Sequence, residues 1–142
     1  MQAPACVQKA TSVAAVWDSR LRSQTVLGCT DNGIAADKVA CFSNLSTTTD
    51  LLAPGAPVTA AGTASPSATV TLAGTSMASG LMAGCVALLR EAVPDAGPAT
   101  IETALRASAV RLTRAPLVQT YPRVDCLDAL LRLDVLFANG FQ

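Results

Sequence analysis

Residues 69–89 read TVTLAGTSMASGLMAGCVALL, and the pattern of side chains changes within this stretch. Thr69 to Leu72 alternate polar and apolar side chains, which is typical of a strand, and Ala73 follows them. After Met77 the residues are small or apolar and carry no charge before Arg90, which is typical of a helix packed in a protein interior. Gly74 lies between the two patterns, so we expect a tight turn from strand to helix there.

A serine lies at this junction. Ser76 would open the helix, and its backbone N–H would then lie at the positive end of the helix dipole, where an oxyanion can bind. A serine hydroxyl is a poor nucleophile unless a base removes its proton, and the usual base is histidine. The chain contains no histidine. A purely structural alternative is that Thr75 or Ser76 caps the helix.

The composition excludes several classes of partner. With 142 residues, of which 51% are hydrophobic, the chain is long enough to bury the core of a single domain. Ten basic and ten acidic side chains cancel, so no long-range field favours nucleic acid or an acidic membrane surface. The longest uncharged apolar run, Leu81 to Leu89, has about half of the roughly 20 residues that a helix needs to cross a bilayer. We therefore expect neither a nucleic-acid partner nor a membrane span.

In the first half of the chain the apolar residues follow strand-like patterns, and in the second half they follow helical spacing. This change predicts an α/β protein. Besides residues 69–73, four segments have strand character: Thr11 to Trp17, Thr25 to Cys29, Lys38 to Ser43 and Pro57 to Ala61. Two segments contain turn residues, Asp31-Asn32-Gly33 and Ala53-Pro54-Gly55, and Thr63 to Thr69 is expected to be a surface loop. Three helices are expected: Met77 to Glu91, a helix that begins at Pro98 with Ile101, Leu105 and Ala109 on one face, and Asp125 to about Leu136.

Five cysteines suggest an oxidising compartment. The pairs that we expect are Cys29 with Cys41 and, less strongly, Cys85 with Cys126, which leaves Cys6 over. Closing the first loop would contribute about 3 kcal/mol to stability. Buried free thiols are the alternative, and a zinc site would need four of the five thiolates to converge. The first ten residues contain no secretory signal, so a signal is expected outside this chain.

Four segments, in this order, resemble the subtilisin-like serine peptidases, or subtilases. The segments are Ala3-Pro4-Ala5 with Thr11 to Val16, which is similar to "SPA…ITVGAV"; Ala40 to Asn44 with Asp50 to Gly55, similar to "FSN…DLLAPG"; Gly74 to Ser79 with Ala83-Gly84, similar to the nucleophile motif; and Tyr121 to Asp125 with Ala129-Leu130, similar to the closing segment. The resemblance covers roughly residues 3–133 and implies one partial peptidase domain over residues 1–142.

The resemblance implies the C-terminal half of a subtilisin-like fold, with a mostly parallel sheet, a buried nucleophile helix and two further helices. Ser76 would be the catalytic nucleophile that forms an acyl-enzyme, with Gly74 and Thr75 supporting the oxyanion site. In the family the triad order is aspartate, histidine, serine, so the other members and the oxyanion asparagine are expected before Met1. The chain alone is then expected to be inactive, and a sheet edge and an apolar face would lack their cover.

The resemblance also implies the partners: a peptide or protein substrate, and the missing N-terminal half of the same domain. It implies a secreted or extracytoplasmic protein without a cofactor. Family members often bind structural calcium, but no carboxylate-rich loop assigns such a site here. Asn32, Asn44 and Asn139 match no catalytic position, so turn or surface roles are expected for them. The family's usual Pro-His is replaced by Gly80-Leu81, which alters the helix more than the chemistry.

Three other interpretations stay open. A sedolisin-type Ser-Glu-Asp peptidase would use a glutamate instead of histidine beside a similar motif. A Ser-Lys dyad would have to use Lys9 or Lys38, the two lysines of the chain. The third interpretation is not enzymatic: a remnant of a subtilase that serves as a binding or inhibitory module.

Overall fold

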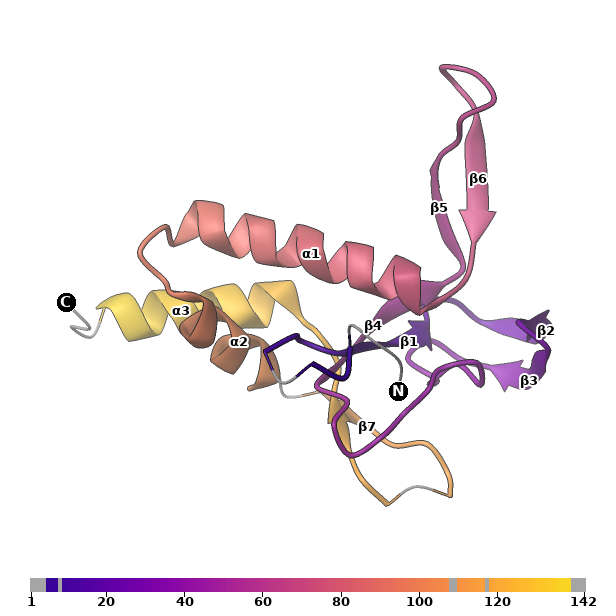
Figure 1. The fold of residues 1–142 in the computed structure, drawn as a ribbon, viewed down its shortest axis with the longest axis horizontal. Coiled ribbons are helices and arrows are strands. Elements are labelled where there is room, and N and C mark those ends of the chain that lie inside the picture. The colour runs from indigo at the N-terminus through magenta and orange to yellow at the C-terminus, as the bar shows by residue number, and fades with distance from the viewer. Residues whose placement is uncertain (1–4, 8, 108–109, 117, 139–142) are drawn as a thin grey trace.

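A computed structural model describes residues 5–7, 9–107, 110–116 and 118–138 of the chain. Over these residues strands fill most of the first half and helices most of the second, as expected for an α/β chain (Figure 1). The strands are β1 Val13–Trp17, β2 Leu21–Val26, β3 Cys29–Ile34, β4 Leu51–Ala56, β5 Val58–Ala61, β6 Thr69–Leu72, β7 Arg111–Leu112 and β8 Tyr121–Pro122; the helices are α1 Thr75–Ala92, α2 Pro98–Arg106 and α3 Cys126–Ala138.

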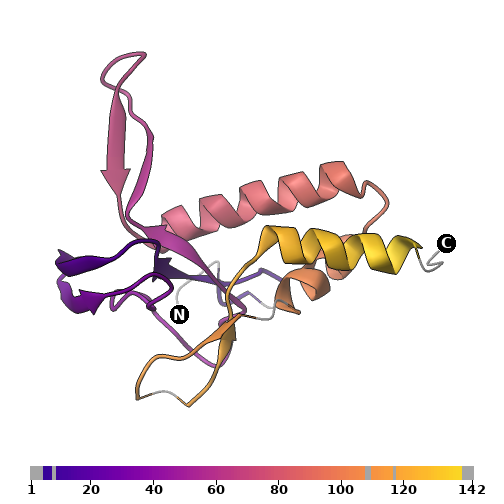
Figure 2. The same ribbon diagram turned by 180° about the vertical axis from the view of Figure 1, so that it is seen from behind.

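The centre of the fold is the parallel pair β1–β4, with Val13 opposite Leu51 and Ala15 opposite Ala53. Both strands are buried on both faces, which explains why their sequences, VAAVW and LLAPGA, read as nearly continuous apolar runs. Helix α1 packs across one face of the pair (Figures 1 and 2). On the other face, Tyr121 closes a second cluster of buried apolar side chains. The pair is therefore a middle layer between two parts of the core.

The sheet differs from the expectation of a mostly parallel one. Of the four two-stranded sheets described, β1–β4 is parallel, whereas β2–β3, β5–β6 and β7–β8 are antiparallel. A parallel bridge between Leu52 and Arg123 adds one more link beside β4. Hairpins need only a short turn, whereas each parallel pair needs a long crossover connection. The described residues contain one parallel pair and three antiparallel pairs, so the prediction of a mostly parallel sheet is wrong.

One edge of β1 has a partner in residues 37–43. The backbone N–H of Trp17 donates to the Lys38 carbonyl at 2.9 Å, and the N–H of Asp37 donates to the Trp17 carbonyl at 2.8 Å. The N–H of Ala40 donates to the carbonyl of Ala15 at 3.0 Å. This segment satisfies the edge without forming the strand that we predicted at Lys38 to Ser43, where only Val39 makes a bridge.

Two of the predicted turns lie inside strands. Asp31-Asn32-Gly33 is part of β3, and the hairpin turns instead at Leu27-Gly28, where φ is 50° and 79°. Positive φ at both positions matches the twist of a tight hairpin. The predicted strand at Thr25 to Cys29 is therefore interrupted by this turn. Ala53-Pro54-Gly55 likewise belongs to β4, because burial against α1 and β1 outweighs its local turn preference.

The three helices are close to their predicted positions. Helix α1 buries one stripe, formed by Ala78, Met82, Cys85 and Leu89, rather than most of its surface. Leu88 on its other face is 63% exposed, which corrects the expectation of a helix buried on most sides.

The other two helices begin as their sequences predicted. Helix α2 begins at Pro98 and buries Ile101 and Leu105; Ala109, predicted on the same face, lies outside the described residues, as does Asn139. Helix α3 begins at Cys126, where the Asp125 carboxylate accepts a hydrogen bond from the N–H of Asp128 at 3.0 Å. Within the described ranges, no helix combines the length and apolar character needed to cross a membrane.

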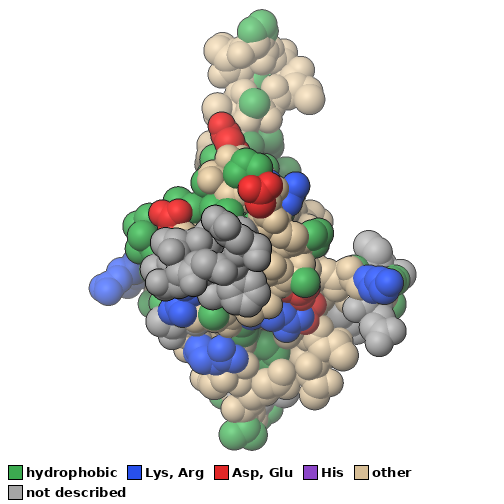
Figure 3. All heavy atoms as spheres, turned by 90° about the vertical axis from the view of Figure 1, so that its left-hand side faces the viewer, with side chains coloured by type: hydrophobic (Ala, Val, Ile, Leu, Met, Phe, Trp, Pro, Cys, Tyr) green, Lys and Arg blue, Asp and Glu red, His purple; other side chains and the backbone are tan. Residues whose placement is uncertain are grey.

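The β5–β6 hairpin projects from the body (Figure 1), and its connecting loop is exposed as predicted for Thr63 to Thr69. Residues 57–73 carry no charge, and in Figure 3 the tip of the projection at the top shows no red or blue side chains. Val70 and Leu72 of β6 are two of its exposed apolar residues. The hairpin leads directly into the junction that contains Ser76.

Candidate functional site

Ser76 is the second residue of α1 and is exposed. The Gly74 carbonyl accepts hydrogen bonds from the N–H of Met77 and of Ala78, at 3.1 and 3.4 Å, which closes the first turn. Among the described residues, nothing accepts a hydrogen bond from the backbone N–H of Thr75 or Ser76. Free N–H groups at a helix start carry partial positive charge and can bind an anion.

The buried stripe of α1 determines which way Ser76 faces. Ala78 is fully buried against the β1–β4 pair. Successive residues of an α-helix are turned by about 100°, so Ser76 lies about 200° from Ala78 around the axis. Burial of Ala78 therefore directs Ser76 away from the core.

Gly55 of β4 fixes the height of this junction over the sheet. Its carbonyl accepts a hydrogen bond from the N–H of Gly74 at 2.9 Å. A Cβ atom on Gly55 would lie 2.7 Å from the Cβ of Ala15 and 2.8 Å from the carbonyl oxygen of Gly74. These distances leave no room for a side chain. Gly55 thus acts through close packing and not through the turn that its sequence suggested.

From the sequence we expected a tight turn at Gly74 that relies on the conformational freedom of glycine, and the structure does not show such a conformation. Its φ of 162° is extended backbone, which other residues also adopt, so the junction does not depend on a conformation reserved for glycine. A Cβ at this position would lie 3.9 Å from the backbone nitrogen of Ser76. This is an ordinary van der Waals contact, so the geometry at Gly74 leaves room for a methyl group.

Neither lysine forms a hydrogen bond with Ser76 in the described part of the chain. Lys38 is held elsewhere, 3.1 Å from a carboxylate oxygen of Asp31. Lys9 lines a groove whose α1 wall begins at Ser79, one turn beyond Ser76. A cleft directly in front of Ser76 stays a prediction.

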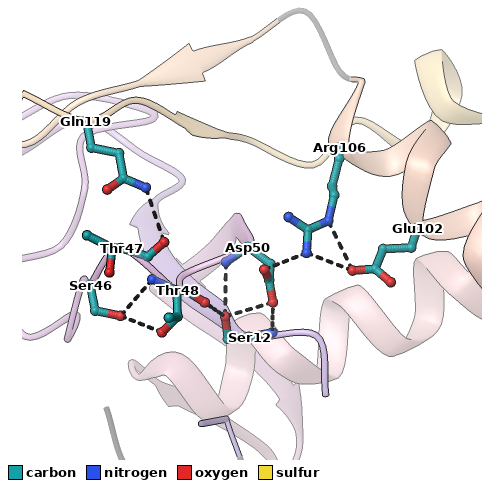
Figure 4. A network of polar contacts seen from close by, with 8 residues as sticks. All are labelled: Ser12, Ser46, Thr47, Thr48, Asp50, Glu102, Arg106 and Gln119. Atoms are coloured by element: carbon teal, nitrogen blue, oxygen red, sulfur yellow. Dashed lines mark hydrogen bonds and ion pairs between the residues drawn. The ribbon is translucent and has the colours of Figure 1, made fainter. Parts of the chain in front are cut away.

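A polar cluster that the sequence analysis did not identify lies at the opposite, amino ends of β1 and β4 (Figure 4). One Asp50 carboxylate oxygen accepts hydrogen bonds from the N–H and the hydroxyl of Ser12 at 2.7 and 2.9 Å. The other lies 2.5 Å from the guanidinium of Arg106, which also pairs with Glu102 at 2.8 Å. Burial by itself raises the pKa of Asp50, but the Ser12 and Arg106 contacts outweigh it and lower the pKa below its ordinary value.

Asp31 is a buried carboxylate with a structural role. It accepts hydrogen bonds from the indole N–H of Trp17 at 2.8 Å and from the N–H of Cys41 at 2.7 Å. Burial raises the pKa of Asp31, but these bonds and Lys38 outweigh that effect, so the pKa is lowered. Asp31 therefore ties β3 to β1, which explains why the Asp-Asn-Gly sequence is not a free turn.

Two disulfides join Cys29 to Cys41 and Cys85 to Cys126, with Cα–Cα distances of 6.1 and 5.8 Å. These are the two pairs that the sequence analysis named, although Cys41 lies in a loop and not on a strand adjacent to β3. The second bridge links the middle of α1 to the start of α3. Cys6 is free and exposed.

No group of three or more potential metal ligands gathers anywhere in the described part of the chain. The structural calcium that the resemblance allows stays an untested expectation. Asn32 and Asn44 are exposed, consistent with the surface roles expected for them.

The fold and the junction define an α/β protein in which a helix presents a serine at the carboxyl ends of two parallel strands. Ligand sites of α/β sheets commonly lie at that end of the strands. The sequence model of the Subtilase family matches residues 1–131, so the chain belongs to the subtilase family of serine peptidases. No curated protein matches the chain.

Proposed function

We propose that Ser76 is the nucleophile of a subtilisin-type serine endopeptidase and that the base reaches it from a segment outside these 142 residues. The observation that carries this proposal is the position of Ser76: it is exposed in the first turn of α1, beside N–H groups that have no partner among the described residues. Family membership supports the reaction class.

In the proposed reaction, the base takes the hydroxyl proton while the Ser76 oxygen attacks the carbonyl carbon of a peptide bond. The negative charge that develops on the carbonyl oxygen is stabilised by the N–H of Ser76. The amine leaves with the proton, and water then hydrolyses the acyl-enzyme by the reverse sequence of proton transfers. Gly74 and Thr75 support the site by setting the approach to Ser76.

An acylation experiment tests the role of Ser76 without the natural base. The chain would be incubated with a fluorophosphonate in the presence of imidazole, and the labelled residue identified by peptide mapping. We expect label on Ser76, none at that position in Ser76→Ala, and unchanged labelling in Ser67→Ala, which alters an exposed serine of the hairpin loop. Equal labelling of several serines would contradict the proposal and favour a non-catalytic binding module.

The localisation is a proposal that the family and the disulfides support. We propose an extracytoplasmic protein, because two disulfides are compatible with an oxidising compartment. Its substrate is a peptide or protein, and no cofactor takes part in the proposed reaction.

A further inference from the structure

A pocket of about 390 Å³ lies where β3 and the loop after it meet the segment that follows β7. We call it the Arg114 pocket. Its lining consists of three charged residues, Asp31, Lys38 and Arg114, and four uncharged ones, Val39, Cys41, Thr113 and Ala115. None of the described residues of α1 lines it, so the pocket is separate from the site proposed at Ser76.

Arg114 is half-buried and is held in place by backbone carbonyl groups. Its Nη1 atom donates to the carbonyl of Ser43 at 2.7 Å, and to those of Ala40 and Cys41 at 3.4 Å. No described residue accepts a hydrogen bond from its Nε or Nη2, and no described carboxylate forms an ion pair with it. Burial of a charge is costly unless an opposite charge accompanies it, so one edge of this guanidinium is available for an anion.

Lys38 brings a second cation to the pocket. Its Nζ atom lies 3.1 Å from a carboxylate oxygen of Asp31 and donates to the carbonyl of Asn32 at 2.7 Å. An ammonium group has three N–H donors, so one donor has no acceptor among the described residues. The lowered pKa of Asp31 keeps its carboxylate ionised at neutral pH. The three charged side chains together therefore leave the pocket with one net positive charge.

The walls of the pocket are fixed by the fold. Cys41 is tied to β3 by its disulfide with Cys29, and its N–H donates to the Asp31 carboxylate at 2.7 Å. Val39, which is 5% exposed, and Ala115 add apolar atoms beside the charges. A few fixed polar groups in a concave, partly apolar site are typical of a small-ligand site.

We propose that the Arg114 pocket binds a carboxylate on a short aliphatic chain, with its oxygens on Nε and Nη2 of Arg114. These two atoms present parallel N–H groups, which match the two oxygens of a carboxylate. One net positive charge balances a carboxylate, whereas a phosphate dianion would carry excess charge close to Asp31. The carboxylate can belong to an acidic side chain of a polypeptide or to a free carboxylic acid. The proposal does not depend on the role of Ser76.

The test is a titration of the isotopically labelled chain, followed by heteronuclear NMR that includes the Nε–H signal of Arg114. Sodium butyrate, neutral butyramide and inorganic phosphate would be compared at neutral pH and constant ionic strength. We expect saturable shifts at residues 38–41 and 113–115 with butyrate, and at least about tenfold weaker binding of butyramide. Equal affinity for butyramide would overturn the proposal, as would tighter binding of phosphate.

Variants of two arginines locate the binding. Arg114→Gln should weaken butyrate binding at least about tenfold, whereas Arg111→Gln, at an exposed position of β7 outside the lining, should change it less than about twofold. Arg114→Lys retains the charge and a donor for the Ser43 carbonyl, so it preserves the loop, but it lacks the paired N–H groups and should also weaken binding. Equal loss in Arg111→Gln and Arg114→Gln, or unchanged affinity in Arg114→Lys, would overturn the proposal.

A peptide distinguishes the two sources of the carboxylate. The tripeptide N-acetyl-Ala-Glu-Ala-amide would be titrated in the same way as butyrate. Tighter binding of the peptide would identify an acidic side chain as the ligand, and tighter or equal binding of butyrate a free carboxylic acid. If neither compound produced saturable shifts, the pocket would not be a carboxylate site and the proposal would fail.

Discussion

At the amino ends of β1 and β4, Ser12 and Arg106 surround the Asp50 carboxylate, whereas at the carboxyl ends the N–H groups of Thr75 and Ser76 have no partner within the described residues. At the first end Ser12 is buried, Asp50 is half-buried and both are hydrogen-bonded, which is how such polar groups add to stability. The second end is held by close backbone packing around Gly55 and by the position of α1. The difference indicates that polar groups stabilise one end of the strand pair and remain available for a ligand at the other.

Removing either disulfide should lower the free energy of unfolding more than the other changes proposed below. The Cys85–Cys126 bridge also holds α1, so its removal tests how far the carboxyl ends of β1 and β4 depend on the position of that helix. Replacing Cys85 and Cys126 by serine opens a loop with a sequence separation of 41, which should lower the free energy of unfolding by about 4 kcal/mol. The shorter bridge, with a separation of 12, should cost about 3 kcal/mol. Urea denaturation measures both, after peptide mapping without reduction has established the pairing. A larger loss for Cys29 and Cys41 would contradict the prediction.

Gly55 tests the packing at the carboxyl end directly. Gly55→Ala places a methyl group against Ala15 and the Gly74 carbonyl, and should destabilise the fold by about 2 kcal/mol. The matched control is Gly84→Ala, at an exposed position of α1 with no atom within 4 Å of the added methyl. That change should stabilise the helix by up to about 1 kcal/mol. Thermal unfolding shows whether each variant is more or less stable than the unsubstituted chain. If Gly84→Ala were destabilised and Gly55→Ala were not, this account of the junction would be rejected.

Asp50 tests the amino end through pH. Asp50→Asn should cost about 2 kcal/mol at pH 7, because the carboxylate loses charge-assisted hydrogen bonds to Ser12. Since the native pKa is lowered, this stability is present above the ordinary pKa of 3.8 and is lost as pH falls through the native value. The difference between wild type and variant should therefore shrink below about pH 4. Asp95→Asn, at an exposed position, is the control; a pH-independent difference for Asp50→Asn would argue against the assigned cause.

Ser76→Ala should have the smallest effect on the free energy of unfolding, within about 0.5 kcal/mol, because the side chain is exposed. Urea denaturation measures this change.

The chain alone should hydrolyse a general peptide substrate no faster than background, with or without Ser76→Ala. The reason is the absent histidine, since a triad that lacks its base retains only the residual effect of binding and oxyanion stabilisation. Turnover that disappears in Ser76→Ala would require another base within the chain.

The sequence located the helices better than the strands. Proline at the start of α2 is a local signal that the structure uses as predicted. Asp125, predicted as the first residue of the third helix, instead precedes α3 and accepts a hydrogen bond from its first turn. The strand errors arise where a long-range contact overrides a local preference. Asp31 is drawn into β3 by Trp17 and Cys41, and Gly55 is held in β4 by the approach of α1.

The sequence by itself determined the family, the change from strand to helix around Gly74, and the lack of a histidine base, because each is written in adjacent residues or in composition. Only the tertiary structure decided that Ser76 faces outward, that Gly55 packs beneath Gly74, and that Asp50 pairs with Ser12 and Arg106. These features join residues distant in the chain, and their distances and burial arise only when strands and helices pack into one core.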